Sequence, residues 1–192
     1  MGEGMHARST HLLRCILVTH THTWGDSLDR ISADDRRELI HETAHLIHPA
    51  FSDQWYRWTP LHIREGWIEV LARILAGTQK ELPASNDYIR TRLPQKLIDP
   101  LLLDEKGLFA FSKRPLSVNH AYLSATSYVA GLASHLGNRD IRDGLKTLKT
   151  MAEEEQDEER FMTRLSRHLN GQLDHPAWRK TVQLRGIERL LE

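Results

Sequence analysis

The chain has 192 residues, of which 40% are hydrophobic and 27% are charged. This composition is typical of a globular domain and excludes a disordered polyelectrolyte. Lysine plus arginine equals aspartate plus glutamate at 26 residues each, which argues against a dedicated nucleic-acid binder. We predict a single domain over residues 1–192 with no nucleic-acid partner.

The sequence contains one cysteine, Cys15, which excludes an intramolecular disulfide. We expect it to be a small buried hydrophobic residue. The early apolar stretch 12–18 is interrupted by Arg14 and lacks a signal-peptide cleavage pattern. We therefore expect a cytoplasmic protein with no membrane span in this chain, unless an upstream sheet or transmembrane anchor is missing from the sequence.

The first 77 residues predict one strand and two helices. Residues 15–24 are rich in β-branched residues and predict a strand or hairpin arm within a short N-terminal part, 1–31. Ser32 and Asp35 form a capping box for a helix that Pro49 should end after residue 48. Thr59, followed by Pro60, predicts the start of a second helix that ends near Gly77.

The remainder, 78–192, is predicted to be helical. A short helix is expected over 86–93, a possible strand over 107–111, and a helix from Ser117 to residue 136. Asn138 should cap a helix over 141–151, and the acidic run 153–159 should form the first turn of a helix that ends at 170–171. Asp174 and Pro176 open a last helix. The fold class is therefore mainly α, or α+β, with a short N-terminal strand or hairpin.

Histidine is unusually frequent, with 12 residues, and two of them form a metal-binding pattern. Residues 41–45 read H-E-x-x-H, so His41 and His45 lie on one helix face and can converge on one metal ion. Glu42 would lie beside the open coordination position. The alternative is an ordinary pair of buried or surface histidines next to a glutamate.

The second helix offers a third ligand, Glu65, which nineteen residues separate from His45. This separation leaves room for the first helix to end, a loop to turn, and a second helix to pack beside it. Three protein ligands are typical of catalytic zinc, and a single cysteine excludes a thiolate cage. We predict one Zn²⁺ per chain with an open position.

Glu69 lies one turn after Glu65 on the same face. It can accept a hydrogen bond from the nitrogen of His41 that does not bind metal, which would fix the orientation of the ring. Its alternative is a solvated surface glutamate. Gly66 is expected to permit the close approach of the two metal-binding helices, because a glycine inside a helix costs about 1 kcal/mol relative to alanine.

These two segments together resemble the gluzincin zinc metallopeptidases, especially their peptidase MA-like members. The family has a W-x-x-E-G-x-A-E segment, and residues 61–69 here match its E-G-x-x-E core but lack the leading tryptophan and the small residue. Residues 122–132 and the stretch with Trp178 are similar to the later helices of these domains, so the likeness covers about 150 residues from Ser32.

The resemblance implies a zincin-like helical domain with an active-site helix and a glutamate helix. It implies zinc on His41, His45 and Glu65, and a peptide or protein substrate. Glu42 would take a proton from metal-bound water and pass it to the leaving amine. Gluzincins place a multi-stranded sheet before the metal helix, whereas about 30 residues precede it here and leave room for one or two strands.

A further donor should stabilise the oxyanion, and the candidates are Tyr56, His120 and Tyr122. Each of them is also compatible with an ordinary role in the core. His62 is an alternative metal ligand near Glu65, and the other notable histidines, at 20 and 22, could form a surface metal site or be inert. The sequence thus predicts a zinc metallopeptidase, with a catalytically inactive zincin-like interaction or metal-binding module as the alternative.

Overall fold

The computed structural model describes residues 6–10, 15–19, 31–50, 54–77, 82–103 and 115–192. This part of the chain is mainly α-helical, as the sequence predicted. Its elements are β1 (His6–Thr10), β2 (Cys15–Thr19), α1 (Ala33–Ala50), η2 (Gln54–Trp58), α2 (Leu61–Ala76), α3 (Pro83–Thr91), η3 (Leu93–Gln95), η4 (Pro100–Leu102), α5 (Pro115–Leu136), α6 (Ile141–Glu155), α7 (Glu158–His168), η5 (Gln172–Asp174) and α8 (Pro176–Leu191).

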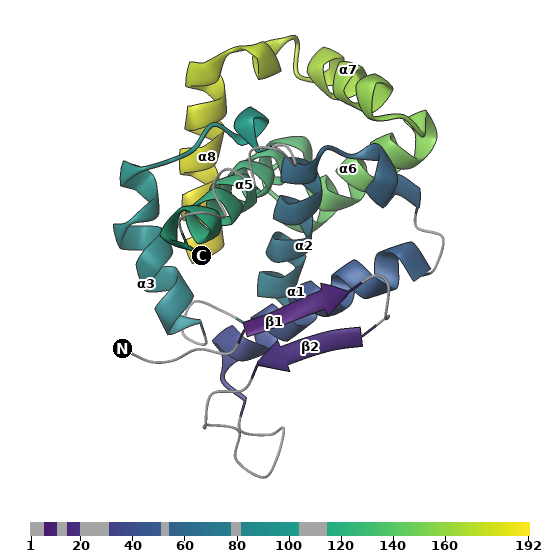
Figure 1. Cartoon of the computed structure of the whole chain (residues 1–192). Coiled ribbons are helices and arrows are strands. Elements are labelled where there is room, and N and C mark those ends of the chain that lie inside the picture. The colour runs from purple at the N-terminus through teal and green to yellow at the C-terminus, as the bar shows by residue number, and fades with distance from the viewer. Residues whose placement is uncertain (1–5, 11–14, 20–30, 51–53, 78–81, 104–114) are drawn as a thin grey trace.

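The N-terminal part forms an antiparallel hairpin in which His6 pairs with Thr19 and Thr10 pairs with Cys15. β1 lies beside α1 (Figure 1). The strand predicted over 15–24 begins at Cys15 in β2, and its last part, 20–24, lies outside the described residues. The possible strand over 107–111 also lies outside them.

The first two helices match their predicted signals closely. The N–H of Asp35 donates to Ser32 Oγ at 3.1 Å, which confirms the predicted capping by Ser32. The Ser32 hydroxyl donates to Oδ2 of Asp35 at 2.7 Å, whereas the return bond of a full capping box would come from the Ser32 backbone N–H. The predicted stop at Pro49 is wrong by two residues, because a proline in the last turn removes a single hydrogen bond and α1 ends at Ala50. α2 begins after Pro60, so Thr59 is not its N-cap, and Gly77 closes it with φ 141°.

Two start signals in the second half were misplaced. α5 begins at Pro115, two residues before Ser117, because proline suits the first turn of a helix. Asp140 caps α6 by accepting from the N–H groups of Arg142 and Asp143, whereas Asn138 adopts a left-handed φ of 49° and lies in the preceding turn.

Two other predicted helices also differ from the structure, and the start of a third is confirmed. The acidic run 153–159 is divided between two helices: α6 ends at Glu155, Gln156 is left-handed with φ 51°, and Asp157 caps α7. The helix predicted over 86–93 begins earlier, at Pro83, and Leu93 belongs to η3. The last helix, α8, begins at Pro176 as predicted.

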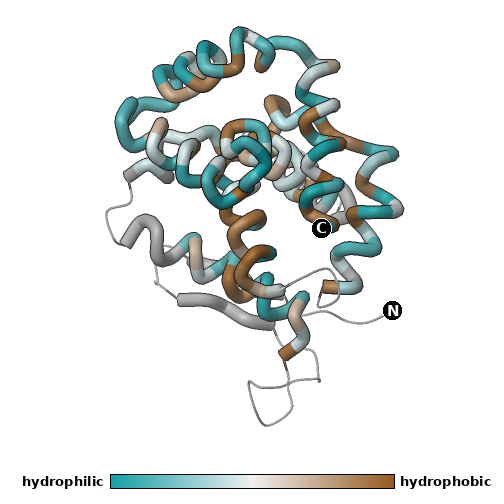
Figure 2. Tube along the Cα trace, turned by 180° about the vertical axis from the view of Figure 1, so that it is seen from behind, coloured by the Kyte–Doolittle hydropathy of each residue, from teal (hydrophilic) through white to brown (hydrophobic). Residues whose placement is uncertain are grey.

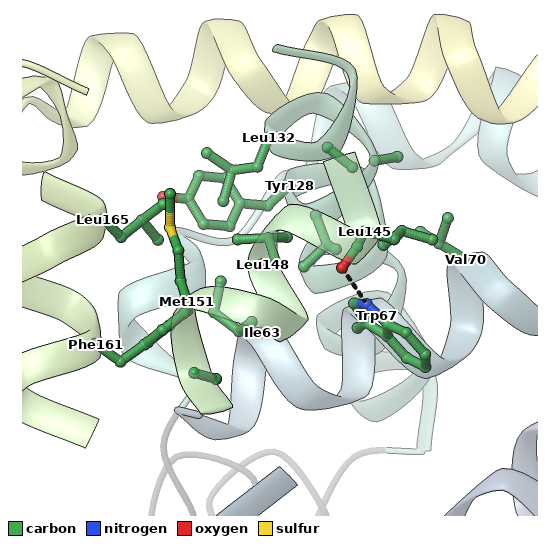
Figure 3. Close-up of a cluster of buried hydrophobic side chains, with 14 of the residues drawn as sticks. Ile63, Trp67, Val70, Tyr128, Leu132, Leu145, Leu148, Met151, Phe161 and Leu165 are labelled. Carbon is green, nitrogen blue, oxygen red and sulfur yellow. Dashed lines mark hydrogen bonds between the residues drawn. The ribbon is translucent and has the colours of Figure 1, made fainter. Parts of the chain in front are cut away.

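The hydrophobic core joins α2 to α5, α6 and α7. Hydrophobic residues concentrate along α2 in the middle of the molecule (Figure 2). Ile63, Trp67 and Val70 on α2 are buried with side chains of the three later helices, and the indole N–H of Trp67 donates to the carbonyl of Leu145 at 3.1 Å (Figure 3). This packing fixes one face of α2 and leaves another, with Glu65 and Glu69, for contact with α1.

Gly66 allows a close helix approach, but not the predicted one. A Cβ placed on Gly66 would lie 2.5 Å from Val129 Cγ2 and 2.6 Å from the carbonyl oxygen of Ala125. Both residues belong to α5, so Gly66 lets α2 approach α5 rather than α1. The prediction that Gly66 permits a close helix approach is confirmed, but the prediction that α1 is the partner helix is wrong.

We expect Gly66→Ala to destabilise the protein. The new methyl group must displace backbone of α5, and overpacking typically costs about 1–3 kcal/mol, against a gain in helix propensity of about 1 kcal/mol. Urea denaturation should therefore show a lower free energy of unfolding. Leu75→Ala on the exposed side of α2 is the control and should change it by less than about 0.5 kcal/mol. Equal stability of Gly66→Ala and the wild type would contradict the tight α2–α5 contact.

Candidate metal centre

Two helices bring the side chains of His41, His45 and Glu65 together. The histidines lie one turn apart on α1, and Glu65 lies near the start of α2. His45 and Glu65 are buried and His41 is half-buried. Within the described part of the chain, these three side chains form a group whose ligand atoms all lie within 4.8 Å of one another. The three predicted metal ligands therefore converge.

The distances between the three donor atoms suit a tetrahedral ion. Nε2 of His45 is 3.0 Å from Nε2 of His41 and 3.1 Å from Oε2 of Glu65, and the remaining distance, from His41 Nε2 to Glu65 Oε2, is 3.6 Å. Zinc bonds to nitrogen and oxygen are about 2.0–2.2 Å long, so two ligands of a tetrahedral zinc ion lie about 3.3–3.5 Å apart. The three distances depart from this range by no more than about 0.3 Å.

A zinc ion also fits the triangle that these atoms form. Its circumscribed radius is about 1.9 Å, so a point about 2.1 Å from all three atoms exists beside its plane. Two imidazole nitrogens and one carboxylate oxygen are a donor set that zinc prefers. The donor set is therefore compatible with the ion that the sequence predicts.

The electrostatics of the site keep Glu65 ionised. Burial by itself raises the pKa of Glu65, but its hydrogen bonds with His41 and His45 prevail and lower it to about 2. Burial by itself lowers the pKa of His41, but its hydrogen bonds with Glu65 and Glu69 prevail and raise it to about 10. Without metal, His41 thus carries a second proton at neutral pH, and a cation that binds its Nε2 must displace that proton.

Glu69 supports the ring of His41 from the other side. Its Oε2 lies 3.0 Å from Nδ1 of His41. This contact is the hydrogen bond that the sequence predicted between the two side chains. Burial raises the pKa of Glu69, but the positive charge of Arg37 and the hydrogen bond with His41 lower it to about 2. Because an ionised carboxylate only accepts, Nδ1 of His41 donates, and Nε2 faces His45 and Glu65.

Sequence reasoning missed two arginines that contact Glu69. Nη1 of Arg37 lies 2.6 Å from Oε1 of Glu69, and Nη1 of Arg73 lies 3.7 Å from the same oxygen. Arg37 precedes His41 by one turn on α1, and Arg73 follows Glu69 by one turn on α2. This four-residue spacing places them on the faces that carry the ligands, and it was the signal by which the sequence could have revealed them.

The other predicted site residues lie on three elements. Glu42 directly follows His41 on α1, and its side chain is half-buried. Tyr56 lies in η2, but its side chain is outside the described part of the structure. Tyr122 is half-buried on α5. The part of Glu42, Tyr56 and Tyr122 in the chemistry stays a prediction.

His120 has two hydrogen bonds that do not involve the ligand group. Its Nδ1 lies 2.9 Å from the hydroxyl of Tyr88 on α3, and its Nε2 lies 2.6 Å from the carbonyl of Lys96. Both ring nitrogens are therefore engaged in contacts that join α5 to α3 and the segment after it. This environment favours the structural alternative for His120.

His62 faces α5 rather than the ligand group. Its ring centroid lies 6.0 Å from that of Tyr128, and its Nε2 is buried without a hydrogen-bond partner among the described residues. Burial lowers its pKa to about 4. His62 is absent from the group of convergent ligand atoms, and its burial favours the neutral form of a core histidine.

His62 should make the protein less stable in mild acid. A folded-state pKa of about 4, against 6.5 in the unfolded chain, means that stability is present above pH 6.5 and is lost as the pH falls toward 4. The shift corresponds to about 3 kcal/mol. We expect denaturation with a chelator present to show this loss between pH 7 and 4.5, and His62→Gln to remove most of it.

His41 does not produce the same loss. Its pKa is raised, so its contribution is fully present below pH 6.5 and disappears only as the pH rises toward 10. The carboxylates Glu65 and Glu69, with lowered pKa values, lose their contributions to stability below pH 4.5.

An identical pH dependence of stability in His62→Gln and the wild type above pH 4.5 would contradict the assignment to His62.

Comparison with family models, curated proteins and solved structures finds no match to this chain. None of the helices in the described ranges is long and apolar enough to cross a membrane.

Proposed function

We propose that the protein is a zinc-dependent metallopeptidase of the gluzincin type, with a zincin-like fold, that hydrolyses peptide bonds. One observation carries the proposal: donor atoms of His41, His45 and Glu65 lie at separations that suit tetrahedral zinc. The hydrogen bond from His41 to Glu69 adds support, because zinc-binding histidines usually donate their other N–H to a carboxylate or carbonyl. Three protein ligands favour a catalytic over a structural site.

In this proposal His41, His45 and Glu65 hold the zinc ion. When bound, zinc would supply a Lewis acid that polarises a carbonyl group and makes water acidic near pH 7. Glu42 is the proposed general base: it accepts a proton from the attacking water and donates it to the leaving amine. Glu42 directly follows His41 on α1, and its side chain is half-buried.

The proposed substrate is a peptide in an extended conformation. The β1–β2 hairpin lies beside α1, the helix that carries both histidines (Figure 1). Among the described residues this sheet has two strands, so each strand has an edge without a partner strand. An extended peptide can pair with such an edge through main-chain hydrogen bonds. The hairpin would in this way align a peptide next to the ligand helix.

The proposal predicts about one zinc ion per chain in purified protein. Zinc would join α1 to α2, so its binding free energy contributes to folding, and a chelator should lower the melting temperature. Elemental analysis and differential scanning calorimetry measure both effects. His45→Ala should abolish stoichiometric zinc binding, and chelator should then have no effect on melting.

The outcomes separate the proposed enzyme from an inactive module. Cleavage of a peptide library by the zinc-loaded protein, lost in the presence of chelator, supports the metallopeptidase. Stoichiometric zinc without cleavage of any peptide would support the metal-binding module instead. A protein that binds no added zinc and melts identically with and without chelator would overturn the ligand assignment itself.

A further inference from the structure

The two oxygens of the Glu69 carboxylate have different partners. Oε1 lies 2.6 Å from Nη1 of Arg37 and 3.7 Å from Nη1 of Arg73. Oε2 lies 3.0 Å from Nδ1 of His41. Glu69 is only 5% exposed, so these protein groups stand in place of water. As long as Arg37 holds Oε1, the carboxylate cannot rotate freely about its last bond, and Oε2 stays directed at His41.

Arg73 is itself held in place by a third helix. The side chains of Arg37 and Arg73 are 19% and 5% exposed. Arg73 donates to Ser85 Oγ at 3.2 Å and to Asn86 Oδ1, and both acceptors lie on α3. The N–H of Ser85 lies 3.4 Å from Oδ1 of Asp34, near the start of α1. Contacts among α1, α2 and α3 thus fix the position of Glu69.

We propose that Arg37 is a positioning residue for the metal ligand His41. By binding Oε1 of Glu69, Arg37 presents Oε2 to Nδ1 of His41 and so fixes the ring with Nε2 toward His45 and Glu65. This inference rests on the proposed zinc site. It assigns to Arg37 no contact with substrate or metal, because its effect passes through Glu69.

Charge and orientation make opposite predictions for the removal of Arg37. A positive charge near a zinc ion is repulsive, so a purely electrostatic effect of Arg37→Met would strengthen zinc binding. Loss of orientation would weaken it, because Glu69 could then turn away from His41. If orientation dominates, the benefit of Arg37 exists only while Glu69 is present. In a Glu69→Ala background, the unpaired charge of Arg37 can only oppose zinc.

The test is a double-mutant cycle of zinc affinity, measured by chelator competition. Arg37→Met should weaken zinc binding about 3-fold to 10-fold in the wild-type background, less than direct removal of a carboxylate that supports a ligand. Arg37→Lys should recover part of the affinity. In the Glu69→Ala background, Arg37→Met should cause no loss or a small gain. Arg36→Met, at an exposed neighbouring position, is the matched control and should change nothing.

A second readout follows the His41 ring directly. In ¹⁵N-labelled zinc-loaded protein, Nδ1–H of His41 should give a slowly exchanging proton signal in the wild type and in Arg36→Met. In Arg37→Met the signal should broaden or exchange faster, and in Arg37→Lys it should be partly restored. A defect of general packing would not be expected to respond in this graded way to the charge at position 37.

Equal weakening by Arg37→Met in both backgrounds would overturn the inference, because it would show that Arg37 acts independently of Glu69. Tighter zinc binding by Arg37→Met in the wild-type background would overturn it as well, in favour of a purely electrostatic role. Unchanged affinity in Arg37→Met, with zinc bound by the wild type, would contradict this inference and leave the proposed function intact. A wild-type protein that binds no zinc would contradict both.

Discussion

Replacing Glu42 with glutamine is expected to lower the rate of peptide hydrolysis about 100-fold to 10,000-fold while leaving zinc content unchanged. Glutamine keeps the size of the side chain and can still accept a hydrogen bond, but it cannot take a proton from water at neutral pH. General acid–base catalysis typically contributes a factor of this size. Hydrolysis of a quenched fluorescent peptide, with zinc measured on the same sample, tests both parts of the expectation.

The matched control is Glu38→Gln. Glu38 precedes Glu42 by one turn on the same helix and is also half-buried, so the substitution makes the same change in charge and shape. It should leave the rate within about 2-fold of the wild type, because Glu38 is one turn farther from the ligands. Equal rates for the wild type and Glu42→Gln would indicate a contaminating protease or another base, and loss of zinc in Glu42→Gln would place Glu42 among the ligands.

The ligand group was predictable because most of its geometry is local to two helices. Histidines four residues apart on a helix face the same way whatever the rest of the fold does. The hydrogen bond between His41 and Glu69 followed from the same rule, applied to Glu65 and Glu69 on the second helix. The one non-local assumption was that α1 and α2 pack beside each other, and the loop between them was long enough to permit this.

Contacts across helices that lie far apart in the sequence were not predictable from local spacing. Gly66 was correctly expected to permit a close approach, but its partner is α5, about 60 residues later. Periodicity shows which residues share a helix face, whereas the helix that covers that face depends on the whole fold. The same limit applies to His120, whose hydrogen bonds to Tyr88 and Lys96 come from segments that the sequence could not place beside it.

The charged groups behind the proposed metal ligands were missed for a different reason. Arg37 and Arg73 continue the four-residue spacing of the site. Exposed arginines on helices are common, however, so the sequence alone does not indicate that these two contact a buried carboxylate. Only burial distinguishes them: the structure places both against Glu69, where they stabilise its ionised form.

The errors in the predicted helix caps were smaller. Asn138 and Asp140 both belong to residue types that cap helices well. Asn138 has a left-handed backbone and lies in the preceding turn, so Asp140 is the residue that caps α6.

Replacing Glu65 and Glu69 in turn should lower zinc affinity in a fixed order. Glu65→Ala removes a proposed ligand and should nearly abolish binding. Glu69→Ala removes only the acceptor of the His41 hydrogen bond, and the loss of such a supporting carboxylate typically costs about 10-fold to 100-fold in affinity. Chelator-competition titration of the two purified variants measures the order directly, with exposed Glu188→Ala on α8 as the control for a loss of one carboxylate.

The structure gives a physical reason for this order. Oε2 of Glu65 lies 3.1 Å and 3.6 Å from the two histidine Nε2 atoms that would bind zinc, whereas Glu69 reaches the site only through Nδ1 of His41. Removal of Glu69 also leaves the positive charges of half-buried Arg37 and buried Arg73 without their shared partner, so part of the effect will be lower stability. Melting temperatures of the metal-free variants separate that part. If Glu69→Ala lost zinc completely and Glu65→Ala kept it, the third ligand would lie one helical turn later, and the spacing on which the gluzincin resemblance depends would be wrong.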